Sequence, residues 1–105
     1  MASLSKREEQ VLLAIWNLKD QAYLLSIKKY LTEITNMDWS LGAVQKPLLQ
    51  LERKQCIRSN MGEATPVRGG RRKKIYFITE RGINILKTER KEQEILWKNF
   101  LEETP

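Results

Sequence analysis

The chain has 105 residues, 41% of them hydrophobic and 30% charged, which indicates one globular domain with a modest core. One cysteine and no histidine exclude an intrachain disulfide and a zinc site built from Cys and His. With so little acid–base or nucleophilic machinery and no phosphate-binding motif, we expect neither an enzyme nor a bound cofactor. The N-terminus lacks the apolar run of a signal peptide, and no stretch approaches the ~20 apolar residues of a membrane span, so we expect a cytoplasmic protein.

Two helices are predicted in the first third of the chain. Ser5 and Glu8 have the spacing of a capping box, which should start a helix that runs to about residue 19. A second helix should span about residues 23–35 after a short polar break. Apolar residues at helical spacing should face the core: Val11, Leu12, Ile15 and Leu18 in the first helix, and Leu24, Ile27, Leu31 and Ile34 in the second.

A third helix should begin after Ser40, whose hydroxyl can cap it, and end near residue 52. Val44, Leu48 and Leu51 would face inward, while Gln45, Lys46 and Gln50 would point elsewhere. Amide and ammonium groups of this kind bond base edges and phosphates of nucleic acid. Pro47 has no amide hydrogen, so we expect a kink or a distorted first turn.

Two short extended runs follow, at residues 57–63 and 73–79, and the loop between them contains Pro and Gly, which predicts a hairpin. Residues 58–79 hold six Lys or Arg and one Glu, so most of the net charge of +6 lies there. The cations are Arg68, Arg71, Arg72, Lys73 and Lys74, together with Arg58. They favour an anionic partner over a loop that is merely kept soluble by its charge. A helix followed by a basic hairpin is typical of a winged helix-turn-helix domain.

Thr79 should cap a last helix that runs to about residue 103, roughly 36 Å at 1.5 Å per residue. Its middle is charged throughout, and an apolar cluster lies near its end: Leu96, Trp97, Phe100 and Leu101. A domain this small cannot cover that cluster with its own core. We therefore expect the cluster to bury against a second copy of the chain.

The motifs resemble those of the PadR family of bacterial transcriptional regulators. The family pattern of the recognition helix is matched by Ser40, Gly42, Leu48, Leu51, Glu52 and Ile57, and that of the wing by Tyr76, Ile78, Thr79 and Gly82. The second helix is similar through Tyr23, Ile27, Lys29 and Leu31. Ala43 and Gln45 replace a Thr and a Tyr of the family pattern, and Gln55 stands where the family has a helix-ending Gly.

The resemblance implies a mainly α (α+β) fold, with a winged helix-turn-helix domain at residues 1–79 and a C-terminal dimerisation helix at residues 80–105. It implies a homodimer that binds a pseudo-palindromic DNA operator, most simply as a repressor. DNA contacts are expected from the recognition helix and the wing: Ser40, Ala43, Gln45, Lys46, Gln50, Arg68, Arg71, Arg72, Lys73 and Lys74.

The resemblance also suggests a small aromatic effector, with Trp97 as a contact, although Trp97 is more simply explained by packing in the dimer. An alternative function is a winged-helix module that binds a protein partner and no DNA. The changed residues of the third helix keep this alternative open.

Overall fold

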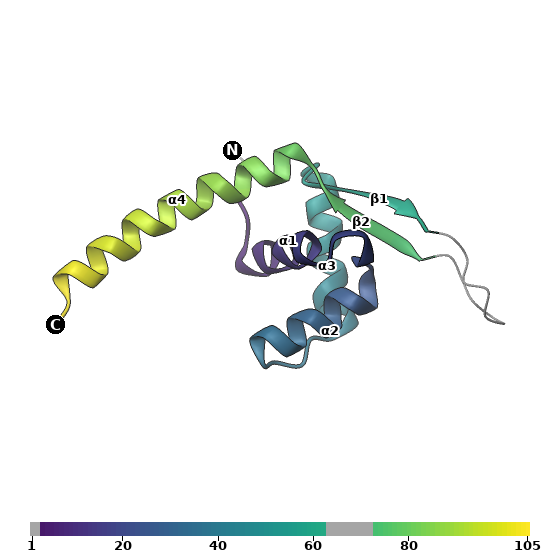
Figure 1. Cartoon of the computed structure of the whole chain (residues 1–105), viewed down its shortest axis with the longest axis horizontal. Helices are drawn as coiled ribbons and strands as arrows, with labels where there is room; N and C mark the ends of the chain where they lie inside the picture. The colour runs from purple at the N-terminus through teal and green to yellow at the C-terminus, as the bar shows by residue number, and fades with distance from the viewer. Residues whose placement is uncertain (1–2, 63–72) are drawn as a thin grey trace.

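The computed structural model describes residues 3–62 and 73–105 (Figure 1). Its helices are α1 (Lys6–Leu18), α2 (Leu24–Thr35), α3 (Leu41–Arg53) and α4 (Glu80–Glu103), and a short 3-10 turn, η1 (Lys19–Gln21), follows α1. Strands β1 (Ile57–Met61) and β2 (Lys74–Ile78) pair antiparallel, with Ile57 opposite Ile78. This order confirms the winged-helix fold.

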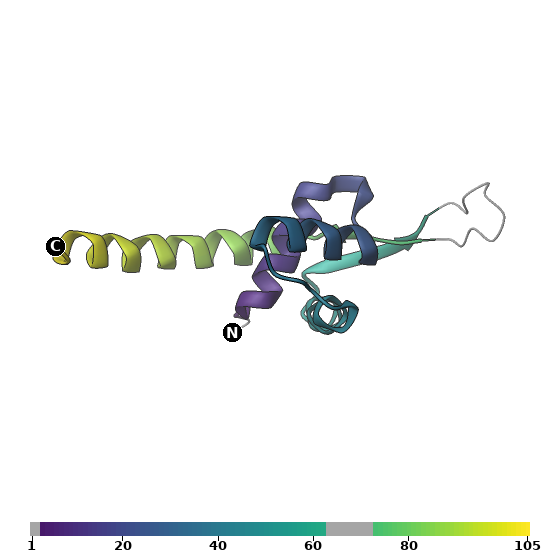
Figure 2. The same ribbon diagram turned by 90° about the horizontal axis from the view of Figure 1, so that it is seen from below.

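Helix α4 leaves the rest of the domain as a long arm, and the molecule measures 59 × 29 × 20 Å along its principal axes (Figure 1). The hairpin extends from the opposite side of the domain, as Figure 2 shows from below. None of the helices in the described ranges is both long and apolar enough to cross a membrane.

Side-chain caps define where the helices begin. Ser5 and Glu8 form the predicted capping box: each side chain accepts from the other's amide, at 2.8 and 3.1 Å. Ser40 Oγ accepts from the Ala43 amide at 3.1 Å, and Thr79 Oγ1 accepts from the Gly82 amide at the same distance. These three predicted caps are confirmed. Helix α2 uses a cap that was not predicted, in which Ser26 Oγ accepts from the Tyr23 amide at 2.9 Å.

The core lies between α1, α2 and α3 and is closed by the sheet. Its buried members are Val11, Leu12, Ala14, Ile15, Ala22, Ile27, Leu31, Trp39, Val44, Leu48, Leu51, Cys56, Ile57 and Tyr76. One predicted core residue is wrong: Ile34 is 66% exposed. It shares a face with Ile27 but lies in the last turn of α2, where the helix extends past the core.

Trp16 of α1 also lies outside the core. Its side chain is 48% exposed, and the Lys19 ammonium lies 3.5 Å from the centroid of its ring. The surface of α1 that carries Trp16 therefore faces solvent in the single chain.

Pro47 does not interrupt α3, which continues from Leu41 to Arg53. The proline ring is buried against the core. Pro47 lacks the amide that would donate to the Ala43 carbonyl, and its ring crowds that carbonyl. The cap at Ser40 has ordinary geometry, and the kink or distorted first turn expected at Pro47 stays a prediction.

The C-terminus of α3 has the double hydrogen-bond pattern of a Schellman motif. The Cys56 amide donates to the Leu51 carbonyl at 2.9 Å, and the Gln55 amide donates to the Glu52 carbonyl at 3.0 Å. Gln55 has a φ of 60° and takes the left-handed conformation that glycine usually supplies. The helix therefore ends as a glycine-capped helix would, with a glutamine at the strained position.

The first turn of α4 packs directly on this junction. Thr79 donates its amide to the Cys56 carbonyl at 2.9 Å and its hydroxyl to the Gln55 carbonyl at 2.7 Å. A Cβ added to Gly82 would lie 2.4 Å from the Cys56 carbonyl oxygen, so only glycine fits there. The end of α3 and the start of the arm thus form one rigid joint.

Candidate nucleic-acid interface

The outer face of α3 is the centre of the predicted DNA contacts. Val44, Leu48 and Leu51 are buried, and their orientation leaves Gln45 and Lys46 exposed on the other side. Ser40 is exposed at the cap, while Ala43 and Gln50 are half-buried at the flank of the helix. The burial of one face therefore presents an amide and an ammonium group to solvent near the start of the helix, where base edges are reached in this class of domain.

Two leucines belong to this outer face and were missed by the sequence reasoning. Leu41 is 43% exposed and Leu49 is 56% exposed, four residues before and after Gln45. Apolar side chains on such a surface can contact thymine methyl groups in the major groove. A spacing of four residues places both leucines on the same side of the helix as Gln45, away from the buried residues. This spacing was the feature of the sequence that could have predicted them.

The wing contributes cations at the start of β2, which pairs with the end of β1. The predicted contacts Arg68, Arg71 and Arg72 lie outside the described residues. Lys73 and Lys74 are described and exposed, and both have partners on the domain. The Lys73 ammonium lies 4.0 Å from the centroid of the Tyr23 ring, and the Lys74 ammonium lies 3.5 Å from Glu52 Oε1. Exposed ion pairs are weak, typically below about 1 kcal/mol, so a phosphate could replace the carboxylate at little cost.

Burial raises the pKa of the Cys56 thiol and of the Tyr76 phenol, so both groups are neutral at physiological pH. Cys56 is fully buried and Tyr76 nearly so. Cys56 is therefore a small apolar core residue, as the sequence suggested.

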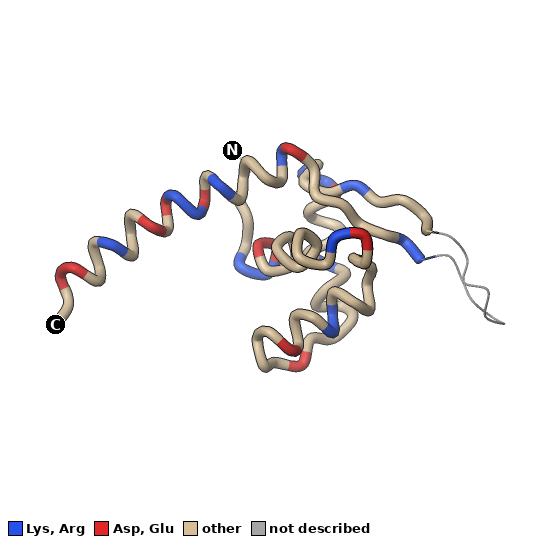
Figure 3. Tube along the Cα trace, in the orientation of Figure 1, with Lys and Arg blue, Asp and Glu red and all other residues tan. Residues whose placement is uncertain are grey.

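The apolar cluster of α4 is exposed in the single chain. Leu96, Trp97, Phe100 and Leu101 are between 55% and 68% exposed, and Ile95, which was not predicted, is 63% exposed. Trp97 and Phe100 contact edge to face, with centroids 5.7 Å apart. Figure 3 shows Lys or Arg alternating with Asp or Glu along the same helix, so the arm has no single sign of charge to attract DNA.

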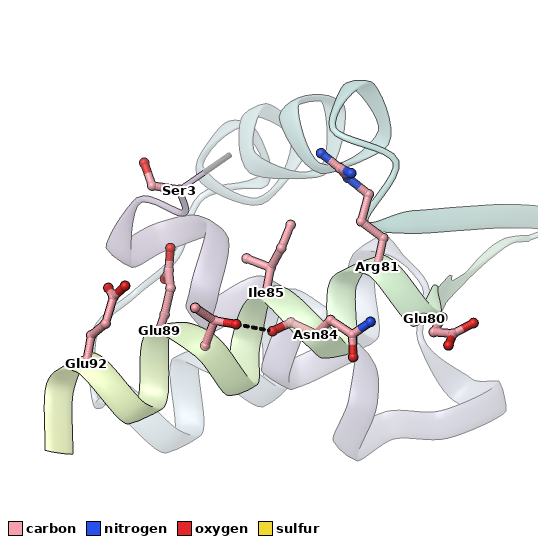
Figure 4. A pocket seen from close by; sticks show the side chains of 8 residues that line it. Ser3, Glu80, Arg81, Asn84, Ile85, Glu89 and Glu92 are labelled. Carbon is pink, nitrogen blue, oxygen red and sulfur yellow. Dashed lines mark hydrogen bonds between the residues drawn. The ribbon is translucent and has the colours of Figure 1, made fainter. Parts of the chain in front are cut away.

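A hollow of about 910 Å³ lies along the first turns of α4, and Figure 4 shows the side chains that line it. It contains three carboxylates, Glu80, Glu89 and Glu92, and one guanidinium, that of Arg81. Glu89 Oε1 accepts from the Leu4 amide at 2.6 Å, and Arg81 Nε donates to the Lys54 carbonyl at 2.9 Å. The acidic lining of this hollow makes it unsuitable for a nucleic acid. The hydrogen bonds of Glu89 and Arg81 connect α4 to the rest of the domain.

Comparison with known proteins gives similar structures but no similar sequence family. No protein-family model matches the chain, and neither does any curated protein. A transcriptional regulator from Clostridium thermocellum is similar with a TM-score of 0.71 and 22% identity, over 97% of this chain and 99% of that one.

Two further solved structures are described as PadR regulators. A PadR-like transcriptional regulator from Bacillus cereus has a TM-score of 0.70 and 20% identity, over 93% of this chain and 92% of that one. A PadR family regulator from Clostridium difficile has a TM-score of 0.66 and 24% identity, over 90% and 95%. All three solved structures are of transcriptional regulators. At these identities the similarity establishes the fold, and this chain has the winged-helix fold of PadR-like transcriptional regulators.

Proposed function

We propose that this protein is a DNA-binding transcriptional regulator that acts as a homodimer in the bacterial cytoplasm, most simply as a repressor. The observation that carries the proposal is the outer face of α3, where Gln45 and Lys46 are exposed beside a capped helix start. The fold and the described regulators that share it support the same function. The domain at residues 1–79 would bind DNA, and residues 80–105 would form the dimer.

In this proposal α3 enters the major groove and Gln45 and Lys46 read base edges. The wing cations bind phosphates or reach an adjacent minor groove. The two recognition helices of the dimer would lie about one helical turn apart, roughly 34 Å, which matches a pseudo-palindromic operator.

The dimer is supported by the exposed apolar surfaces of α4 and α1. Leu96 and Trp97 are 68% and 59% exposed, and Leu13 and Trp16 on α1 are 40% and 48% exposed. A hollow lined by Leu13 and Leu86 lies between α1 and α4. The end of α4 of a second copy could pack on this surface. In a two-fold dimer each such contact occurs twice. Trp97 would then pack in the interface, and a flat aromatic effector could contact it there.

Selection of bound fragments from a random DNA pool, with full-length protein, tests the function. We expect a recovered palindrome with half-sites about one turn apart. Binding of recovered DNA should weaken steeply as salt rises, because each phosphate contact adds about 0.9 to the slope of log K against log salt.

A variant with Arg71→Ala and Arg72→Ala should bind all sequences less tightly and have a shallower salt slope. Weak, salt-insensitive binding with no recovered motif would instead favour the protein-interaction module.

A further inference from the structure

A second charged surface lies beside α3, on the side away from the wing. A hollow of about 450 Å³ separates the first turn of α1 from α3, and its polar lining includes Ser5, Arg7, Lys46 and Gln50. In Figure 2 the start of α1 and helix α3 both lie along the lower side of the domain. The hollow is therefore continuous with the outer face of α3 through Lys46 and Gln50.

Arg7 is held in place by the core. Its guanidinium carbon lies 4.3 Å from the centroid of the Trp39 ring, a stacking distance. Trp39 is only 2% exposed, and its indole nitrogen donates to Thr35 Oγ1 at 3.0 Å, so the ring is a fixed platform. Stacking uses the face of the guanidinium and leaves its N–H groups available at the edge. Among the described residues, Arg7 forms no ion pair.

The carboxylate of Glu8 does not cancel the positive charge of Arg7 in the hollow. Glu8 also lines it, but its carboxylate is 2.7 Å from the Lys54 ammonium and accepts from the Ser5 amide at 2.8 Å. Glu8 is only 6% exposed. Arg7 and Lys46, from two different helices, therefore leave a net positive charge around the opening.

We propose that this hollow binds a phosphate of the DNA backbone, with Arg7 and Lys46 donating to its oxygens from opposite sides. The inference rests on the proposed function and adds to it a contact made by α1. A guanidinium presents two parallel N–H groups that suit phosphate oxygens. Because Arg7 is fixed on Trp39, the contact fixes the depth and register of α3 in the groove. Arg7 is thus a positioning residue, and the bases are read by α3.

The test measures binding of full-length protein to a mixed-sequence duplex of about three helical turns over a range of salt concentrations. Arg7→Gln should weaken binding and lower the salt slope by about 0.9 per protomer. The matched control is Lys6→Gln, which removes an equal charge from the neighbouring position of α1 that does not line the hollow. Its slope should stay near that of the wild type.

Arg7→Lys separates charge from geometry. It should keep the slope near the wild-type value but bind several-fold more weakly, since an ammonium cannot form the paired hydrogen bonds. Equal losses in the Arg7→Gln and Lys6→Gln variants would show a general charge effect and overturn the phosphate site, as would an unchanged Arg7→Gln. Wild-type protein without salt-dependent binding would instead overturn the proposed function itself.

Discussion

The ammonium of Lys54 lies 2.7 Å from Oε1 of Glu8, and the two residues join the end of α3 to the start of α1. The same ammonium donates to the Ser3 carbonyl at 2.8 Å. The Glu8 side chain is 7% exposed and that of Lys54 is 28% exposed, so water does little to screen the pair. Since the arm contacts the same region through Arg81 and Glu89, this ion pair lies where three helices meet.

Lys54→Met should destabilise the fold by about 2 kcal/mol at neutral pH, because it leaves the Glu8 carboxylate buried without its cation. Urea unfolding of variant and wild type measures this. Replacing both residues, with Glu8→Gln added, should recover part of the loss. A double variant less stable than Lys54→Met alone would show that Glu8 acts through something other than this pair.

The ion pair between Glu8 and Lys54 should also affect how stability depends on pH. Burial raises the pKa of Glu8, but hydrogen bonds from Lys54 and Ser5 and the charge of Lys54 outweigh it, so the pKa is lowered from its ordinary value. The contribution of Glu8 to stability is therefore present above the ordinary pKa of a glutamate and is lost as the pH falls through the lowered pKa. In the Lys54→Met variant, burial is the dominant influence on the pKa of Glu8 and raises it. Protonation then removes the buried charge, so the loss in free energy of unfolding relative to wild type should shrink as the pH falls. A deficit independent of pH would contradict this.

Gln55→Gly should stabilise the protein by about 0.5–1 kcal/mol. A side chain at a φ of 60° is strained, and glycine removes the strain while the backbone bonds of the motif remain. Gln55→Ala is the control, because it keeps a Cβ and should give no gain. Thermal unfolding measures both variants, and equal melting temperatures for them would argue against strain at this position.

Gly82→Ala should destabilise the protein by about 2 kcal/mol or more and loosen the arm, since the new methyl group would meet the Cys56 carbonyl at 2.4 Å. The contacted atom belongs to the backbone and cannot turn aside. Gly42→Ala is the matched control within a helix: its nearest neighbour, Ser40 Oγ, is 4.0 Å away. That change should be neutral or stabilising. Similar losses of stability in the Gly82→Ala and Gly42→Ala variants would contradict close packing of Gly82 on the Cys56 carbonyl.

Gln45→Ala should lower the preference for one base pair by about 1–3 kcal/mol and leave binding to unrelated DNA nearly unchanged. Its amide is exposed on the outer face of α3. Comparing the sequences selected by variant and wild type measures the change. Gln21→Ala removes the same side chain outside α3 and should leave the selected motif intact. Identical motifs from Gln45→Ala and wild type would mean that Gln45 reads no base.

Ending the chain at Arg90 should give a monomer that binds the operator far more weakly, because the second set of DNA contacts is lost. The truncation removes the exposed apolar cluster of α4. Lys98→Ala changes the same segment outside the cluster and should remain dimeric. Sedimentation and DNA titration together measure the effect. A truncated chain that still dimerises would place the interface elsewhere.

Local chemistry let the sequence predict most of the elements. Ser5, Ser40 and Thr79 cap their helices through atoms three residues away, and contacts over so short a span can be recognised in the sequence. The bounds of α4 and the pairing of the hairpin follow equally from local signals. The outer face of α3 was predictable too, because burying Val44 and Leu48 leaves only one orientation for Gln45.

Only the tertiary structure decided the rest, because it depends on residues far apart in the chain. Ile34 has the right period for the core, but its exposure depends on where the neighbouring helices end. Pro47 is tolerated because its ring packs in the core, and the need for Gly82 comes from a carbonyl 26 residues earlier in the chain. Arg7 and Trp39 share no sequence pattern, yet the packing of α1 on α3 stacks them at the edge of the proposed DNA-binding surface. Contacts within a few residues leave a pattern in the sequence, whereas contacts between distant segments exist only once the core has brought them together.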